Sequence, residues 1–239
     1  VATATPVGTP APAGTATPAA GTKAATTFVG SPNRADIGLQ DGKGAGVRFY
    51  EPNGIVVAAD ETVYVTDTNS HALRKCNTDG TVLTISGNQK PGKNNGQGVA
   101  ASFNLPKGVA IATDGTIFVA DTGNHMIRKY AISGLVTLVA GTGSAGKANG
   151  FGDAASFDAP DGLAVGSDGA VYVADTNNHL IRRIVLDATG TATVTTLAGS
   201  GTAGSADGVG ETASFRAPQG IVAAPGGVLY VATVSDNLI

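Results

Sequence analysis

Apolar and polar positions alternate in short blocks along most of the chain. In one such block the apolar runs are rich in Val, Ile, Leu and Thr, and they occupy residues 109–112, 117–120, 126–130 and 135–140. Turn residues separate the runs, including Asp114-Gly115, whose glycine accepts the positive φ of a tight hairpin. Because no segment keeps a 3.6-residue apolar period, the pattern predicts four short antiparallel strands and little helix.

The block recurs at a nearly fixed period. A Phe-x-x-Pro-x-Gly motif places prolines at positions 52, 106, 160 and 218, so the spacings are 54, 54 and 58 residues. A period of a few tens of residues is typical of solenoids, propellers and arrays. The run 171–174 is apolar on both of its faces, which indicates a sheet covered on both sides. The pattern therefore predicts an all-β fold, a β-propeller of four-stranded antiparallel blades.

A second motif supports a family resemblance. Residues 175–183 read Asp-Thr-Asn-Asn-His-Leu-Ile-Arg-Arg, and related copies stand at 67–75 and 121–129. On these residues the chain resembles the NHL-repeat β-propellers. The Gly-x-Gly stretches before each Phe are similar to the longer bacterial NHL repeats. The resemblance covers residues 26–239, with repeats expected at about 26–80, 81–134, 135–190 and 191–239.

The repeats predict three complete blades and one partial blade, and three arrangements stay open. The chain is a fragment of a longer propeller, or a four-bladed ring, or an open arc. In the ring, Thr26-Thr27-Phe28-Val29-Gly30 would supply the outer strand of the last blade. In the arc, the unpaired edge would pair with a neighbouring molecule, because such an edge is a template for strand addition.

Residues 1–25 differ from the rest in composition. They are rich in Ala, Thr and Pro, which cannot build a core, and they predict a linker or tether. Threonines of this segment are candidate O-glycosylation sites, namely Thr3, Thr5, Thr9, Thr15 and Thr17. The start at Val1, without Met or a signal peptide, fits a processed or excerpted chain. We expect an extracytoplasmic location, either secreted or at the cell surface.

Composition excludes several classes of partner. The net charge is −3 with 15 Lys and Arg residues, so there is no basic surplus for nucleic acid. No apolar run approaches the 18 residues of a membrane span, and membrane insertion is not expected. The lone Cys76 forms no intrachain disulfide and is predicted to be a buried strand residue.

The repeated polar residues are predicted to be structural. The three histidines fall in the same turn of different repeats and cannot easily converge on one zinc ion. Aspartates recur seven residues before arginines, as expected of carboxylate–guanidinium pairs. The structural set comprises Asp67, His71, Arg74, Asp121, Asn124, His125, Arg128, Asp175, Asn178, His179 and Arg182. No catalytic residue, metal or cofactor is predicted.

The function predicted from these features is a non-enzymatic binding or structural module. A protein or glycan would bind the loop-rich face, and a specific version is a surface or fibre subunit. That subunit would self-associate through the open blade edge and the N-terminal strand. The alternative is a metal-dependent propeller enzyme of the lactonase or amidating-lyase type, which needs acidic or His ligands at the axis.

Overall fold

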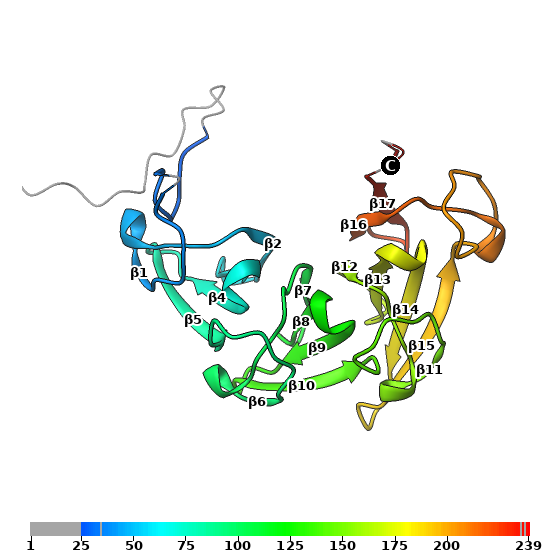
Figure 1. Cartoon of the computed structure of the whole chain (residues 1–239), viewed down its shortest axis with the longest axis horizontal. Helices are drawn as coiled ribbons and strands as arrows, with labels where there is room; N and C mark the ends of the chain where they lie inside the picture. Colours follow the sequence, from blue (N-terminus) through cyan, green and yellow to red (C-terminus); the bar gives the residue numbers. More distant parts are fainter. Residues whose placement is uncertain (1–24, 34, 235, 237) are drawn as a thin grey trace, which may run out of the picture.

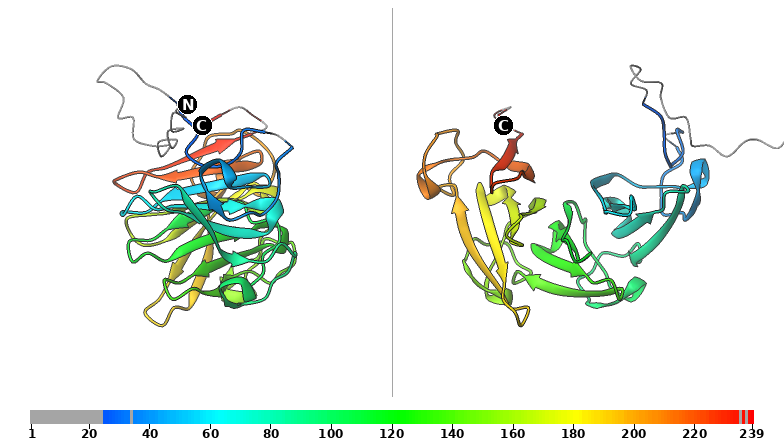
Figure 2. Two further views of the ribbon diagram at one scale, coloured as in Figure 1. Left: turned by 90° about the vertical axis from the view of Figure 1, so that its left-hand side faces the viewer. Right: turned by 180° about the vertical axis from the view of Figure 1, so that it is seen from behind.

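The computed structural model describes residues 25–33, 35–234, 236 and 238–239. Over these residues the chain has no α-helix, and its strands form four antiparallel sheets. The sheets lie side by side in an arc that follows the chain from its N-terminal to its C-terminal part (Figure 1). The view from behind and the side view show the same order (Figure 2).

Sheets I, II and III have five strands each and sheet IV has two among the described residues. Sheet I contains β1 (Gly42–Lys43), β2 (Pro52–Val57), β3 (Val63–Asp67), β4 (Ala72–Cys76) and β5 (Thr81–Gly87). Sheet II contains β6 (Gly96–Gln97), β7 (Val109–Ile111), β8 (Ile117–Asp121), β9 (Met126–Tyr130) and β10 (Leu135–Ala140). Sheet III contains β11 (Gly150–Phe151), β12 (Pro160–Val165), β13 (Val171–Asp175), β14 (Leu180–Leu186) and β15 (Ala192–Ala198). Sheet IV contains β16 (Pro218–Ala223) and β17 (Leu229–Thr233).

The predicted strands of the second repeat are confirmed, but the prediction of four-stranded blades is wrong. In sheets I–III a two-residue strand pairs antiparallel with the outer strand, as in the register Gly42↔Val82. This short segment is extended and satisfies backbone groups at an edge that four strands would leave open. The first predicted repeat ends at about residue 80. In the structure β5, which starts at Thr81, pairs with β4 and so belongs to sheet I.

The N-terminal segment that would supply the outer strand of a closed four-bladed ring packs at the opposite end of the arc. Gly30 donates a backbone hydrogen bond to Gly44 O at 3.1 Å, and Val29 packs on the cluster that contains Val47 and Val82. Residues 25–33 therefore lie against sheet I, whereas sheet IV ends the arc on the other side (Figure 1). The structure thus does not support the closed four-bladed ring.

The core lies between neighbouring sheets. Buried side chains of sheet II, including Val109 and Val119, pack with Val56 and Tyr64 of sheet I. The larger cluster likewise joins sheets II and III. Because each interior sheet is covered on both faces, both of its side-chain rows are apolar, as the sequence pattern indicated.

The glycine of each Pro-x-Gly motif allows the innermost strands to approach one another. A Cβ on Gly54 would lie 2.2 Å from Lys107 O, and on Gly108 it would lie 2.0 Å from Asp161 O. On Gly162 it would lie 2.0 Å from Gln219 O. Any side chain there would push neighbouring sheets apart. The motif therefore sets the spacing of β2, β7, β12 and β16, which face the concave side of the arc (Figure 1).

Cys76 is buried in β4, and burial raises the pKa of its thiol to about 11. Over the described residues, no helix has the length and apolar character that a membrane crossing requires.

Candidate functional site

A cavity of about 550 Å³ opens at the concave side of the arc, where the four innermost strands meet. It is lined by equivalent triplets, one from each sheet: Asn53-Gly54-Ile55, Lys107-Gly108-Val109, Asp161-Gly162-Leu163 and Gln219-Gly220-Ile221. Each triplet begins at the x position of a Pro-x-Gly motif. We call this the axial cavity.

The polar side chains of the axial cavity all occupy that x position. They are Asn53, Lys107, Asp161 and Gln219. The glycine that follows places the backbones of adjacent strands in contact, so the side chains of neighbouring x residues come close together. Lys107 Nζ lies 2.9 Å from Asp161 Oδ2 and donates a hydrogen bond to it.

This ion pair is accessible on one side. The Lys107 side chain is 32% exposed and the Asp161 side chain 10% exposed. The ammonium and the carboxylate are therefore in direct contact, with the lysine the more exposed of the two. The arrangement supplies a base and a positive charge at one wall of a cavity, flanked by two neutral amides.

The predicted structural histidines lie elsewhere and connect neighbouring sheets. Each follows a 3₁₀ turn and has a left-handed backbone, with φ of 51° at His71, 55° at His125 and 58° at His179. Each Nδ1 accepts a hydrogen bond from the backbone N–H of the next sheet's corner, at Leu105, Ala159 and Ala217 respectively.

A threonine in the same turn makes the second contact between sheets. The hydroxyls of Thr68, Thr122 and Thr176 donate to the carbonyls of Pro106, Pro160 and Pro218, each at 2.7 Å. Because the three histidines belong to separate joints, the structure does not bring them together.

The predicted aspartates and arginines pair inside each five-stranded sheet. The three pairs are Arg74–Asp67 at 2.7 Å, Arg128–Asp121 at 3.0 Å and Arg182–Asp175 at 2.8 Å. Asn124 and Asn178 donate to the aspartates of their own turns, at 2.8 Å in both cases. Burial raises the pKa of Asp121 to about 6, against the lowering effect of hydrogen bonds from Asn104 N–H, Asn124 and Arg128.

None of these residues lines the axial cavity. Neither Lys107 nor Asp161 is among the residues predicted from the sequence, although a signal was present. Position x is the one residue between the Pro and Gly of a repeated motif, and it differs in all four copies. The candidate glycosylation sites Thr3, Thr5, Thr9, Thr15 and Thr17 lie outside the described residues.

The donor set of the axial cavity does not fit a metal ion. Amide and carboxylate oxygens are ligands of hard cations, but Lys107 Nζ already occupies Asp161 Oδ2 and brings a positive charge to the same place. Across the part of the chain that the structure describes, no group of three or more His, Cys, Asp or Glu side chains is placed to hold a metal.

Comparison with known proteins places these features in a family. The model of the SMP-30/Gluconolactonase/LRE-like region matches residues 45–203, from before β2 to just beyond β15. The chain is 37% identical over 150 residues to "Protein SUPPRESSOR OF QUENCHING 1, chloroplastic" of Arabidopsis thaliana, covering 58% of this chain and 14% of that protein. It is 39% identical over 87 residues to "NHL repeat-containing protein 2" of Gallus gallus, covering 36% and 12%.

A further relative carries the name of an enzyme. The chain is 32% identical over 143 residues to "Probable peptidyl-alpha-hydroxyglycine alpha-amidating lyase pgal-1" of Caenorhabditis elegans, covering 58% of this chain and 38% of that protein. The chain thus spans only part of the length of each of these relatives.

Two solved structures share the fold. An auxiliary nutrient binding protein from Bacteroides thetaiotaomicron matches with a TM-score of 0.60 and 21% identity, over 78% of this chain and 46% of that one. A gluconolactonase from Xanthomonas campestris matches with a TM-score of 0.54 and 17% identity, over 76% and 56%. At these identities the likeness concerns the fold alone.

These comparisons correct two predictions. The prediction that the chain is not an enzyme is wrong, because the family model and the lyase relative point to enzymatic propellers. The NHL resemblance is confirmed by the NHL repeat-containing relatives, but nothing specific to the long bacterial repeats supports that finer assignment. The chain belongs to the SMP-30/gluconolactonase/LRE-like family.

Proposed function

We propose that the axial cavity is the active site of an enzyme that hydrolyses a lactone or a related cyclic ester. The Lys107–Asp161 pair carries this proposal, because it places a carboxylate and an ammonium 2.9 Å apart at the wall of an open cavity. Membership of a family that is named for gluconolactonase supports the reaction class. The cavity volume of about 550 Å³ is in the usual range for a small-molecule site.

The reaction uses the two charges in turn. The Asp161 carboxylate takes a proton from a water molecule as the water oxygen bonds to the lactone carbonyl carbon. The carbonyl oxygen becomes an oxyanion, which the Lys107 ammonium stabilises. When the ring C–O bond breaks, the proton held by Asp161 passes to the leaving alkoxide oxygen, and a hydroxy acid results.

The two amides have a binding role in this scheme. Asn53 and Gln219 lie on the strands that flank β7 and β12, so their side chains face the cavity from either side of the ion pair. An amide both donates and accepts hydrogen bonds, which suits the hydroxyl groups of a sugar-like ring. Neither amide carries charge, so these residues orient the substrate while the proton transfer stays with Asp161.

The lyase relative favours a second candidate reaction at the same pair. Over 143 residues the chain matches a protein that is named as a probable α-amidating lyase of peptidyl-α-hydroxyglycine. In that chemistry Asp161 would take the proton of the α-hydroxyl as the C–N bond breaks and the C=O bond of glyoxylate forms. Asp161 would then pass this proton to the departing amide nitrogen, and the Lys107 ammonium would stabilise the negative charge that develops. The products would be a peptide amide and glyoxylate.

Two assays separate the candidate reactions. Lactone hydrolysis releases acid, which a pH indicator records, and the lyase reaction releases glyoxylate, which a colorimetric assay records. We expect lactone hydrolysis by the 239-residue chain, and a roughly 100-fold loss of kcat/KM in Lys107→Met and Asp161→Asn, the loss typical of a removed charge-stabilising group.

A matched lysine variant serves as the control. Lys90 is exposed on the loop between β5 and β6, so Lys90→Met should keep full activity. Lys90→Met should unfold within about 1 kcal/mol of the parent chain, because an exposed charge contributes little to stability. Lys107→Met and Asp161→Asn should remain folded under the assay conditions, which urea denaturation checks. Equal turnover by Lys107→Met and Lys90→Met would contradict the proposal.

A further inference from the structure

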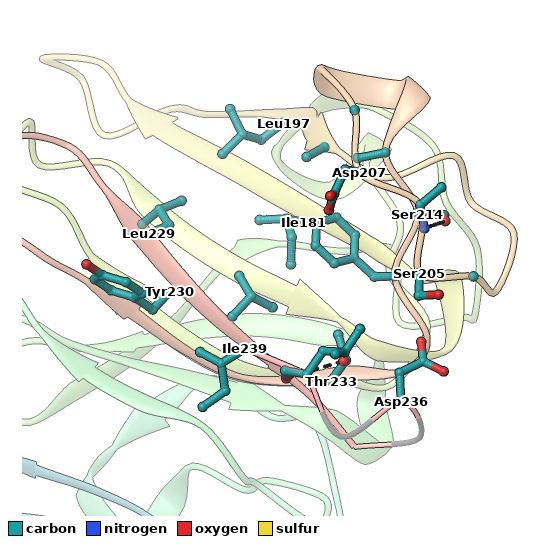
Figure 3. Close-up of a pocket in the computed structure, with 18 residues that line it drawn as sticks. Ile181, Leu197, Ser205, Asp207, Ser214, Leu229, Tyr230, Thr233, Asp236 and Ile239 are labelled. Carbon is teal, nitrogen blue, oxygen red and sulfur yellow. Dashed lines mark hydrogen bonds between the residues drawn. The ribbon is translucent and has the colours of Figure 1, made fainter.

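Two cavities of this molecule differ in the charges that line them. The larger, of about 580 Å³, lies between sheet III and the last repeat. Figure 3 shows Asp207 and Asp236 on one side of it and Leu229 on the other, and no Lys or Arg is among its described lining residues. In the axial cavity, by contrast, the Lys107 ammonium touches the Asp161 carboxylate. The position of that ammonium depends on what holds Lys107.

The hydroxyl group of Thr66 holds the backbone of Lys107. Thr66 lies in β3 of sheet I and is fully buried. Its Oγ1 donates a hydrogen bond to Lys107 O, just before β7 of sheet II, and accepts one from Gly54 N–H at 2.8 Å. Gly54 O is a second acceptor at 3.3 Å, a longer contact, and a hydroxyl has a single proton to give. Thr66 therefore links the innermost strand of sheet I to the residue that carries the ammonium.

No other copy of the repeat has a hydroxyl at this position. The position precedes Asp67 and its equivalents, and the other copies have Ala120, Ala174 and Ala232 there. The innermost strands of sheets II and III approach closely without a hydroxyl, since a Cβ on Gly108 would lie 2.0 Å from Asp161 O. Alanine is thus sufficient for packing, and the hydroxyl adds a hydrogen bond at the joint where the next sheet carries a lysine.

Both polar groups of the Lys107 backbone are thereby fixed. Lys107 N–H donates to Ala120 O at 3.0 Å within its own sheet, and Lys107 O accepts from Thr66 of the neighbouring sheet. The lysine side chain is long and 32% exposed, so many rotamers are open to it. A fixed backbone restricts the positions that Nζ can reach, and the position it takes is 2.9 Å from Asp161 Oδ2.

We propose that Thr66 is a positioning residue, whose hydroxyl keeps the Lys107 ammonium in contact with Asp161. Thr66 is not among the residues that line the axial cavity, so it acts through Lys107 and not on a substrate. Its effect on turnover rests on the proposed function, in which the Lys107 ammonium stabilises an oxyanion. Such stabilisation depends on a donor that is held in place before the reaction, and small displacements reduce it.

Chemical labelling tests the position of Lys107 without an enzyme assay. Acetic anhydride acylates a free amine, and an ammonium held in a hydrogen bond to a carboxylate is shielded from it. Limited labelling of the 239-residue chain, followed by peptide mass spectrometry, gives the ratio of acetylation at Lys107 to that at the exposed Lys90. Thr66→Ala introduces the residue of the other three copies. It should raise this ratio about threefold, because the ion pair is made less often.

Thr66→Ser separates the hydroxyl from the bulk of the side chain. Serine can donate the same hydrogen bond to Lys107 O, so this variant should keep the parental labelling ratio. Thr176→Ala is the matched control, because it removes another buried hydroxyl that bonds across two sheets, from Thr176 Oγ1 to Pro218 O at 2.7 Å. It should lower Tm about as much as Thr66→Ala and leave the labelling ratio unchanged, since its joint lies between sheets III and IV.

The lactone assay tests the consequence for turnover. Thr66→Ala should lower kcat about tenfold and change KM by less than about twofold, because a misplaced ammonium affects the transition state more than substrate binding. Thr66→Ser and Thr176→Ala should keep the parental kcat. If the parent chain hydrolyses no lactone, the proposed function is wrong, and the labelling ratio alone decides the role of Thr66.

The two measurements together support the proposal if labelling and kcat both change in Thr66→Ala and both recover in Thr66→Ser. An unchanged Lys107 labelling ratio in Thr66→Ala overturns it, and so does a parental kcat of that variant in a chain that hydrolyses lactones. It is also overturned if Thr66→Ser behaves as Thr66→Ala, since the hydroxyl would not be the cause. An equal change of the ratio in Thr176→Ala overturns it too, since the loosening of any joint would then suffice.

Discussion

Two of the ion pairs in the described part of the chain, the repeated Asp–Arg pair and the Lys107–Asp161 pair, have different surroundings. The Asp–Arg pair recurs in sheets I, II and III, with side chains that are at most 1% exposed. The Lys107–Asp161 pair occurs once, between two sheets, at the wall of an open cavity. The repeated pair is surrounded by its own fixed hydrogen-bond partners, whereas the single pair has room for another molecule beside it. Repetition with burial thus indicates a structural pair, whereas the position of Lys107 and Asp161 at the wall of the axial cavity makes them the candidate site.

The cost of removing a partner follows from this difference. A buried charge that loses its partner keeps its desolvation penalty without the compensating attraction. In the axial pair Lys107 is 32% exposed and Asp161 10% exposed at the wall of a cavity, so a charge left there is hydrated in part. The same chemical change should therefore unfold the chain in one place and abolish activity in the other.

The largest expected effect is the loss of stability in Arg128→Met. Asp121 would stay fully buried and lose its guanidinium, keeping only the donors at Asn104 N–H and Asn124. We expect the free energy of unfolding to fall by about 3–5 kcal/mol. Urea denaturation of Arg128→Met and Lys107→Met measures the contrast.

The double variant Asp121→Asn/Arg128→Met serves as a check on the cause. It removes the orphaned charge and should recover part of the lost stability. If Arg128→Met lowers the free energy of unfolding no more than Lys107→Met does, the buried Asp121–Arg128 pair does not have the structural role proposed for it.

A smaller effect on stability is expected at the contact between innermost strands. In Gly108→Ala the new Cβ would lie 2.0 Å from Asp161 O, so β7 and β12 must separate. We expect a loss of about 1–3 kcal/mol, typical of overpacking, together with reduced activity because the Lys107–Asp161 distance changes. Denaturation and the lactone assay measure both.

Gly220 provides a matched control at the same motif position. The nearest atom to a Cβ there is Cβ of Ala232 in the paired strand β17, at 3.4 Å, and no strand of another sheet approaches it among the described residues. Gly220→Ala should therefore change stability by less than about 0.5 kcal/mol. Equal losses in both variants would show that backbone propensity, and not the contact between sheets, sets the cost.

Much of the fold could be predicted from the sequence because its signals are local and repeated. The expected runs 117–120 and 126–130 match β8 and β9 to within one residue. The two-residue strands such as β6 could not be predicted, because Gly96-Gln97 has no strand-like side-chain pattern and is held by its pairing with β10. The position of residues 26–30 depends on which sheet edge they meet, and a similarity of sequence to other strands does not determine it.

The candidate site was harder to predict for a physical reason. A site built from one residue per repeat has no local signature, since Lys107 and Asp161 are 54 residues apart and meet only when neighbouring sheets pack. The repeated Asp and Arg positions gave a stronger pattern and directed attention to structural residues. Three positions vary inside the Phe-x-x-Pro-x-Gly motif, and the sequence alone does not show that the one between Pro and Gly faces the axial cavity.

The smallest expected effect concerns pH and the joint between sheets I and II. His71 Nδ1 accepts from Leu105 N–H at 3.0 Å, so protonation at Nδ1 breaks this bond. Burial lowers the pKa of His71. In the unfolded chain the pKa of this histidine is about 6.5, so as the pH falls the unfolded chain takes up the proton before the folded chain does. The hydrogen bond between His71 and Leu105 therefore contributes its full stability above about pH 6.5, and this contribution is lost as the pH falls through the lower pKa of the folded chain.

His71→Asn isolates this contribution, since asparagine tolerates the left-handed backbone but does not titrate. His125 suits the experiment less well, because Asp158 Oδ1 lies 3.5 Å from its Nδ1 and would pair with the protonated ring. Between pH 7.5 and 5.5 the parent chain should lose more stability than His71→Asn in urea denaturation. Equal losses would mean that this joint does not sense pH.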